Sequence, residues 1–170
     1  MRKVRYRVAM SLDGYIAGPK GEIDWIIMDP EIDFGAIISQ FDTLLVGRRT
    51  FETMVKAGQT TMPGMRTIVF SRTLEPSQFP GVTIWRNKQN EQLASLRAGA
   101  GKDLWLFGGS SLFQSLLGAD LVNAVEVSVM PVLLGGGVPF LASPANAKKL
   151  DLTGHKIYKS GIALLEYAVE

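Results

Sequence analysis

The sequence contains no cysteine and only one histidine, His155. Without a thiol, the protein cannot form a disulfide, use a thiolate nucleophile or build a cysteine zinc site. A lone histidine with no cysteine beside it supplies too few of the usual ligands for a transition metal, so we expect no bound metal.

The sequence also lacks long apolar runs and blocks of like charge. No apolar stretch reaches the roughly 18 residues that a membrane-spanning helix needs, and the basic start MRKVRYRVAM is followed by Ser, Asp and Gly instead of an apolar signal region. The net charge is only +2, with no cluster of Lys and Arg. We therefore expect a cytoplasmic protein whose partner is a small molecule, and neither nucleic acid nor a membrane.

The sequence does contain an alternation of strand-like and helix-like segments in a chain of 170 residues, 46% of them hydrophobic. That size suits one domain, residues 1–170, with one substantial core. Stretches rich in β-branched, aromatic or leucine residues predict eight strands, at residues 4–10, 43–47, 66–71, 82–86, 103–107, 124–131, 155–159 and 162–169. Helical spacing of apolar residues predicts about four helices, at residues 34–41, 48–54, 93–96 and 112–117.

The order of these segments predicts an α/β fold. Helices between the early strands require crossover connections, which favour parallel pairing, whereas the short KSG turn before the last strand favours an antiparallel C-terminal hairpin. We predict a mixed, mostly parallel eight-stranded sheet flanked by about four helices.

The segment LWLFGGSS, residues 104–111, ends a strand at two glycines and opens a helix with two serines. Backbone N–H groups at such a junction, together with the helix dipole, can bind a diphosphate, and this assigns Gly108, Gly109, Ser110 and Ser111 to a candidate phosphate site. A tight turn with serine caps explains the same residues. The segment lacks the third glycine of the Rossmann fingerprint, which argues against a Rossmann domain.

Two further strands end in groups that suit phosphate. In DTLLVGRRTFETM, Gly47 ends a strand and Arg48, Arg49 and Thr50 open a helix, where the arginines oppose the dipole unless an anion compensates them. A solvated first turn is the alternative. Ser71 and Arg72 follow a third strand, where an ordinary turn would also explain them. Three such junctions at the carboxyl ends of strands favour a phosphorylated dinucleotide lying across the sheet.

With these motifs, the chain resembles the dihydrofolate reductase-like superfamily, and within it the reductase domain of bifunctional riboflavin-synthesis deaminase/reductases. The resemblance is carried by MSLDGYIAG (residues 10–18), DTLLVGRRTFE (42–52), IVFSRT (68–73), LWLFGGSSLFQSLL (104–117) and VMPVLLGGGVPFL (129–141). It spans nearly the whole chain and implies a three-layer dihydrofolate reductase-like fold with NADPH as the cofactor.

The resemblance also implies where the cofactor lies. The segment 108–111 would face the diphosphate, residues 47–50 the diphosphate and adenosine phosphate, and Ser71 and Arg72 the 2′-phosphate. Ala9, Met10, Ile16 and Gly18 match positions that line the nicotinamide. An arginine fork suits a 2′-phosphate, which favours NADPH over NADH.

The loop after the first strand, SLDGYIAGPKGEIDW, should border the substrate and cover it during hydride transfer. Asp13, Trp25 and Phe34 are the candidate substrate contacts. Asp13 could instead complete its own turn through its side chain, and Trp25 could belong to the core.

The proton donor is expected at Glu31 or Asp33. Dihydrofolate reductases place a carboxylate at the start of the helix before the GR-x-T strand, and these two acids lie near that position. The same residues, in MDPEIDF, also suit a helix start, with Pro30 early in the helix and the acids stabilising its dipole.

We therefore expect an NADPH-dependent reductase of a small heterocyclic or ribosylaminopyrimidine substrate. The leading reaction is that of a 5-amino-6-(5-phosphoribosylamino)uracil reductase in riboflavin synthesis. Dihydrofolate reductase is the alternative enzyme, and a nucleotide-binding sensor or assembly module without turnover is the alternative of another class. The apolar segments AVEVSVMPVLL and IALLEYAV lie far from the cofactor motifs and need covering, which predicts a homodimer.

Overall fold

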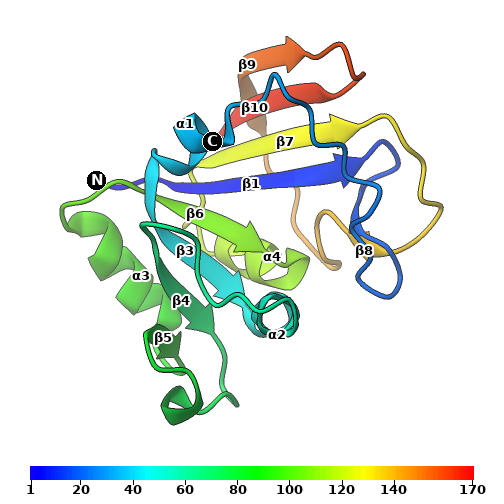
Figure 1. Cartoon of the computed structure of the whole chain (residues 1–170). Coiled ribbons are helices and arrows are strands. Elements are labelled where there is room, and N and C mark those ends of the chain that lie inside the picture. The colour runs from blue at the N-terminus through cyan, green and yellow to red at the C-terminus, as the bar shows by residue number, and fades with distance from the viewer.

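The computed structural model describes all residues, 1–170, and has a central sheet between two layers of helices (Figure 1). The central sheet comprises β1 (Val4–Ser11), β3 (Phe41–Gly47), β4 (Arg66–Phe70), β5 (Val82–Trp85), β6 (Asp103–Gly108), β7 (Ala124–Met130), β9 (Leu150–Ile157) and β10 (Ala163–Val169). A small second sheet pairs β2 (Tyr15–Ala17) with β8 (Val138–Pro139). The helices are α1 (Phe34–Ile38), α2 (Arg48–Lys56), α3 (Gln89–Ala98) and α4 (Ser110–Gly118), with a 3-10 turn η1 at Pro76–Gln78.

The strands of the central sheet run in the order β5-β4-β3-β6-β1-β7-β10-β9. Pairing is parallel from β5 to β7, because helices or long connections carry the chain back to the same end after each of these strands. Only β10 runs antiparallel to its neighbours, β7 and β9. The predicted mixed sheet, its four helices and its C-terminal hairpin are confirmed.

Alternation along the strands creates apolar clusters on both faces of the sheet. Leu104 and Leu106 of β6 belong to the larger cluster, which also holds Leu93 of α3 and Phe113 and Leu116 of α4. Trp105, between the two leucines, points to the opposite face.

The second cluster contains Trp105 together with Phe51 and Met54, which lie three residues apart on one side of α2. Ile37 and Ile38 of α1 pack against it as well. Helices α3 and α4 therefore cover one face, and α1 and α2 the other. No helix has the length and apolar character needed to cross a membrane.

Three local predictions differ from the structure. The predicted helix at 34–41 ends at Ile38, and Phe41 instead begins β3, where it is buried. Strand β9 begins at Leu150, five residues before the predicted start, because this edge strand is mostly exposed and has no apolar alternation to mark it. The short sheet of β2 and β8 was not predicted, since each strand has only two or three residues.

Candidate active site

The strand order places the predicted cofactor junctions side by side. Strands β4, β3, β6 and β1 are consecutive in the sheet and parallel, so their carboxyl ends lie along one edge. With neighbouring strands about 4.8 Å apart, β4 and β1 are separated by about 14 Å. A dinucleotide with its 2′-phosphate at the end of β4 and its diphosphate at β3 and β6 would present its nicotinamide at β1.

The junctions after β3 and β6 touch each other. A Cβ added to Gly47 would lie 3.6 Å from the backbone nitrogen of Gly109, and one added to Gly109 would lie 3.2 Å from Oγ1 of Thr50. Gly108 has φ +135°, which favours glycine, and the Gly108–Gly109 peptide bond is cis. These glycines therefore keep the two backbones close together, and side chains at these positions would narrow the space between them.

Helices α2 and α4 begin at these junctions without side-chain caps. Their N-cap residues are Gly47 and Gly109, and neither helix start has a side-chain hydrogen bond to its first-turn amides. The explanation of Ser110 and Ser111 as N-caps is therefore wrong, because both lie inside α4. Two helix N-termini with uncapped amide donors form a cradle that suits a diphosphate.

The arginines near this cradle differ in their contacts. Arg48 donates from Nε to Oε1 of Glu52 at 2.7 Å and from Nη1 to Oγ1 of Thr73 at 2.9 Å. Glu52 thus compensates the charge of Arg48 at the start of α2. Arg49 and Arg72 are exposed, and their side chains have no hydrogen bond or ion pair within the protein. Their guanidinium groups are available to an external phosphate.

Ser71 shapes the backbone beside Arg72. It is 5% exposed, and its hydroxyl accepts hydrogen bonds from the amides of Thr73 and Leu74, at 3.3 and 3.1 Å. The turn that sequence reasoning offered as an alternative is therefore present. Because the hydroxyl still has its own proton, Ser71 can also donate to a phosphate oxygen.

The residues expected at the nicotinamide come from both sides of the sheet. Ala9 packs against the cluster formed by Met130, Tyr158 and Ile162, whereas Met10 packs against the large core on the α3 and α4 face. The two side chains therefore point in opposite directions, as alternation along β1 requires. Only one of the two side chains can therefore contact a nicotinamide ring that lies on one side of the sheet.

Ile16 and Gly18 lie in the loop after β1. Ile16 belongs to β2 and is half-buried, while Gly18 is buried against the side chain of Glu22. A Cβ on Gly18 would lie 2.3 Å from Oε2 of Glu22. A side chain at residue 18 would therefore displace the side chain of Glu22.

The candidate substrate contacts have different surroundings. The indole nitrogen of Trp25 donates to the carbonyl of Glu22 at 3.0 Å, and its ring packs against the same apolar cluster as Ala9. Phe34 begins α1 and is 40% exposed. Asp13 is exposed, but both oxygens of its carboxylate accept hydrogen bonds from the protein.

The two candidate proton donors lie near the start of α1. Asp33 is the N-cap, and its Oδ1 accepts from the amide of Ala36 at 2.8 Å. Glu31 is exposed, 3.8 Å from Nζ of Lys159. The helix begins at Phe34, so the placement of Pro30 early in the helix is wrong, whereas capping by Asp33 is confirmed.

Sequence reasoning missed a buried carboxylate, Asp29. Asp29 is 5% exposed, and its Oδ1 accepts a hydrogen bond from the amide of Glu31 at 2.7 Å. The only signal was that Asp29 precedes a proline, which favours a turn. Four other acids lie at positions 22–33, and the sequence does not distinguish the buried one from them.

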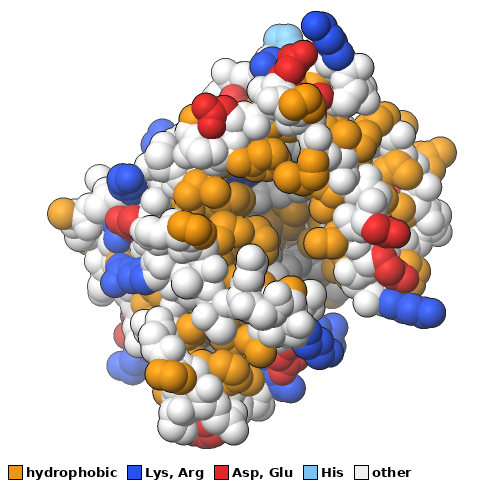
Figure 2. All heavy atoms as spheres, in the orientation of Figure 1, with side chains coloured by type: hydrophobic (Ala, Val, Ile, Leu, Met, Phe, Trp, Pro, Cys, Tyr) orange, Lys and Arg blue, Asp and Glu red, His pale blue; other side chains and the backbone are white.

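Figure 2 shows a hollow on the face of the molecule that Figure 1 presents, near the carboxyl ends of β1 and β6 and bordered by hydrophobic side chains.

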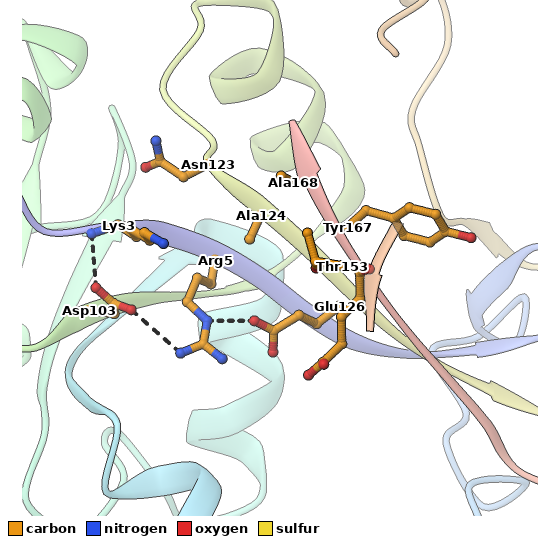
Figure 3. Close-up of a pocket in the computed structure, with 10 residues that line it drawn as sticks. Lys3, Arg5, Asp103, Asn123, Ala124, Glu126, Thr153, Tyr167 and Ala168 are labelled. Carbon is orange, nitrogen blue, oxygen red and sulfur yellow. Dashed lines mark hydrogen bonds and ion pairs between the residues drawn. The ribbon is translucent and has the colours of Figure 1, made fainter. Parts of the chain in front are cut away.

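A separate cavity of about 290 Å³ lies at the other end of the strands (Figure 3). There Arg5 bonds with Glu126 and Asp103, and the amide of Lys3 donates to Asp103. Asp103 and Glu126 are thus already engaged within the protein, and none of the predicted cofactor junctions lies at this end. The hollow at the carboxyl ends is therefore the candidate active site.

Comparisons with known proteins identify relatives of this chain. A family model described as the RibD C-terminal domain matches residues 2–164. The uncharacterised protein YyaP of Bacillus subtilis is 31% identical over 178 aligned residues, which cover 98% of this chain and 94% of YyaP.

Two solved structures share the fold. A putative riboflavin biosynthesis protein from Shewanella sp. PV-4 has a TM-score of 0.86 and 25% identity, with 100% of this chain and 99% of that chain covered. Dihydrofolate reductase from Enterococcus faecalis, solved with NADP(H), has a TM-score of 0.72 and 20% identity, with 99% and 96% covered. The predicted dihydrofolate reductase-like fold is confirmed.

Proposed function

Because the chain belongs to the RibD C-terminal domain family, we propose that it is an NADPH-dependent reductase of a small heterocyclic or ribosylaminopyrimidine substrate. Its family and fold support an oxidoreductase, and the Enterococcus faecalis enzyme of the same fold binds NADP(H). The observation that carries the proposal is the cradle formed by Gly47 and Gly109, with the free arginines Arg49 and Arg72 beside it.

The residues of the chain fit NADPH in three ways. The uncapped amides at the starts of α2 and α4 would bind the diphosphate, and the absence of a Cβ at Gly109 leaves room for it. Arg49 and Arg72 would bind the 2′-phosphate. The bound nicotinamide would supply the hydride, while the loop after β1 would cover the hollow and exclude water.

Among substrates, 5-amino-6-(5-phosphoribosylamino)uracil is the first to test, since the family is that of a riboflavin-pathway reductase domain. The residues that border the substrate side nevertheless have few partners for a 5′-phosphate. Positions 12–34 contain six carboxylates and one lysine, Lys20. A phosphorylated sugar there would depend on backbone amides, so the dephosphorylated compound should be tested beside it.

The decisive experiment measures NADPH binding first and NADPH oxidation second. Binding is followed by nicotinamide fluorescence, and oxidation by the loss of NADPH absorbance with each ribosyl compound and with dihydrofolate. Oxidation with a ribosyl compound supports the leading reaction, whereas oxidation with dihydrofolate alone would support the alternative enzyme. Binding without oxidation of any substrate would favour a sensor or assembly module, and no binding of NADPH would contradict the proposal.

A further inference from the structure

Two loops at the edge of the candidate active site are tied together. We call residues 12–18, after β1, the first-strand loop, and residues 131–137, after β7, the glycine loop. The amide of Leu12 donates to the carbonyl of Val132 at 2.9 Å, and farther along β2 pairs with β8. The amide of Phe140 donates to the carbonyl of Gly14 at 2.8 Å. Segments about 120 residues apart in sequence thus lie against each other.

The centre of this contact is the carboxylate of Asp13. Its Oδ1 accepts from the amide of Leu134 at 3.0 Å and its Oδ2 from the amide of Gly135 at 2.7 Å. Oδ1 also accepts from the hydroxyl of Ser11 at 2.6 Å, and the oxygen of that hydroxyl accepts from the amide of Tyr15 at 3.0 Å. Two successive amides of one loop are therefore bound by one carboxylate of the other.

The glycines let the second loop approach this closely. Gly135, whose amide binds Asp13, has φ +71°, a conformation that favours glycine. Gly137 has φ +141°, and a Cβ there would lie 2.1 Å from the carbonyl oxygen of Ala17. The contact between the loops is built from backbone shape and one side chain.

From this geometry we infer that Asp13 is a positioning residue whose carboxylate joins the first-strand loop and the glycine loop into one wall of the substrate cleft. Its consequence for catalysis rests on the proposed function, because these loops flank the place where the nicotinamide and substrate would meet. Asp13 then acts through the backbone of residues 134 and 135.

The ionised carboxylate is essential to this arrangement. Only without a proton can both oxygens act purely as acceptors, as the two amide donors and the Ser11 hydroxyl require. The hydrogen bonds from Ser11 and from the amides of Leu134 and Gly135 lower the pKa of Asp13 to about 2. The side chain is therefore charged throughout the neutral range.

Hydrogen exchange in the free protein tests the joint without needing a cofactor. In Asp13→Asn one of the two loop amides would face an NH₂ group, and the charge of the acceptor would be lost. We expect the amides of Leu134 and Gly135 to exchange about tenfold faster or more, and the amide of Tyr15 in the partner loop to accelerate with them.

Two comparison variants separate charge from geometry. Asp24→Asn removes a carboxylate that is exposed in the same connection and has no hydrogen bond within the protein, so exchange at all three amides should stay as in the wild type. Asp13→Glu keeps the charge but lengthens the side chain, and it should accelerate exchange as Asp13→Asn does. Unchanged exchange in both Asp13 variants, or acceleration in the glycine loop with Tyr15 unchanged, would overturn the inference.

A kinetic comparison then separates positioning from general loss of structure. NADPH should bind Asp13→Asn within about twofold of wild type, because the cradle lies at β3 and β6, whereas kcat for the substrate found above should fall at least about tenfold. Equal losses in NADPH affinity and thermal stability would contradict a positioning role. If wild-type protein does not bind NADPH, the proposed function fails, while the exchange experiment still decides whether Asp13 joins the loops.

Discussion

Replacing Arg72 with alanine should remove most of the preference for NADPH over NADH. Arg72 is exposed at the end of β4 and has no partner within the protein, so the variant loses no internal contact and its stability should change by less than about 0.5 kcal/mol. A charged hydrogen bond contributes about 1.5 to 3 kcal/mol, and exposure to water and salt places this one near the lower end. NADPH affinity should therefore fall about tenfold, while NADH affinity stays nearly unchanged.

The contacts of the neighbouring arginines predict an order of effects. Arg49 is equally free, so Arg49→Ala should behave like Arg72→Ala. Arg48 is already compensated by Glu52 and hydrogen-bonded to Thr73, so Arg48→Ala should cost less NADPH affinity. Arg66→Ala, at the other end of β4, removes the same charge far from the cradle and serves as the control.

Calorimetric titration of each variant with NADPH and with NADH, at low and at moderate salt, measures this preference. The difference between the two cofactors should shrink with added salt in the wild type and be small at both concentrations in Arg72→Ala. If all three variants near the cradle kept the NADPH preference, the placement of the 2′-phosphate would be wrong. A largest effect from Arg48→Ala would refute the ranking by free guanidinium groups.

Three further predictions concern the cradle, the loop joint and the sheet edge. Gly109→Ala should weaken the binding of NADPH and of NADH alike in the same titrations. The new Cβ would lie 3.2 Å from Oγ1 of Thr50 and would intrude on the site of the diphosphate, which both cofactors contain. Normal binding of both cofactors would contradict the cradle. The lowered pKa of Asp13, about 2, means that its stabilising contribution is present above the unfolded pKa of about 3.9 and is lost as pH falls through about 2. Protection of the Gly135 amide, taken relative to its intrinsic exchange rate at each pH, should therefore decrease over this range in wild type but not in Asp13→Asn. We also propose a homodimer, but β7 and β10, which carry the apolar segments expected to need covering, lie inside the sheet, so we place its interface at the edge strand β9, where Leu152 and Ile157 are 57% and 66% exposed. Light scattering at micromolar concentration should give a dimer for wild type and a monomer for Leu152→Lys with Ile157→Lys. A wild-type monomer would contradict the dimer, and a dimeric double variant would contradict this interface.

The core strands and the glycine-containing junctions after them could be predicted because local sequence determines them strongly. Leu104 and Leu106 mark a buried strand, and the glycines that follow mark a close backbone approach, whatever surrounds them. The resemblance to a known family then placed those junctions in one fold. The order of the strands across the sheet was not predicted and comes from the structure.

The substrate side could not be predicted in the same way, because its contacts join distant segments. Asp13 followed by glycine suggests a turn, but its acceptors are used by Leu134 and Gly135, which no local pattern identifies as partners. Phe41 fits the helical spacing of the residues before it and the alternation of the strand after it. Tertiary contacts decided both cases.

The place of β1 at the centre of the sheet has a consequence for synthesis on the ribosome. Val4 pairs with Leu104, and β1 also pairs with β7 as far as Met130, so the first strand to emerge waits for partners made much later. At roughly 5 to 20 residues per second, that wait lasts about 6 to 25 seconds. During it, Val4 and Tyr6, both fully buried in the finished protein, have no sheet to cover them. The nascent chain therefore keeps the apolar side chains of β1 uncovered until β6 and β7 have been made.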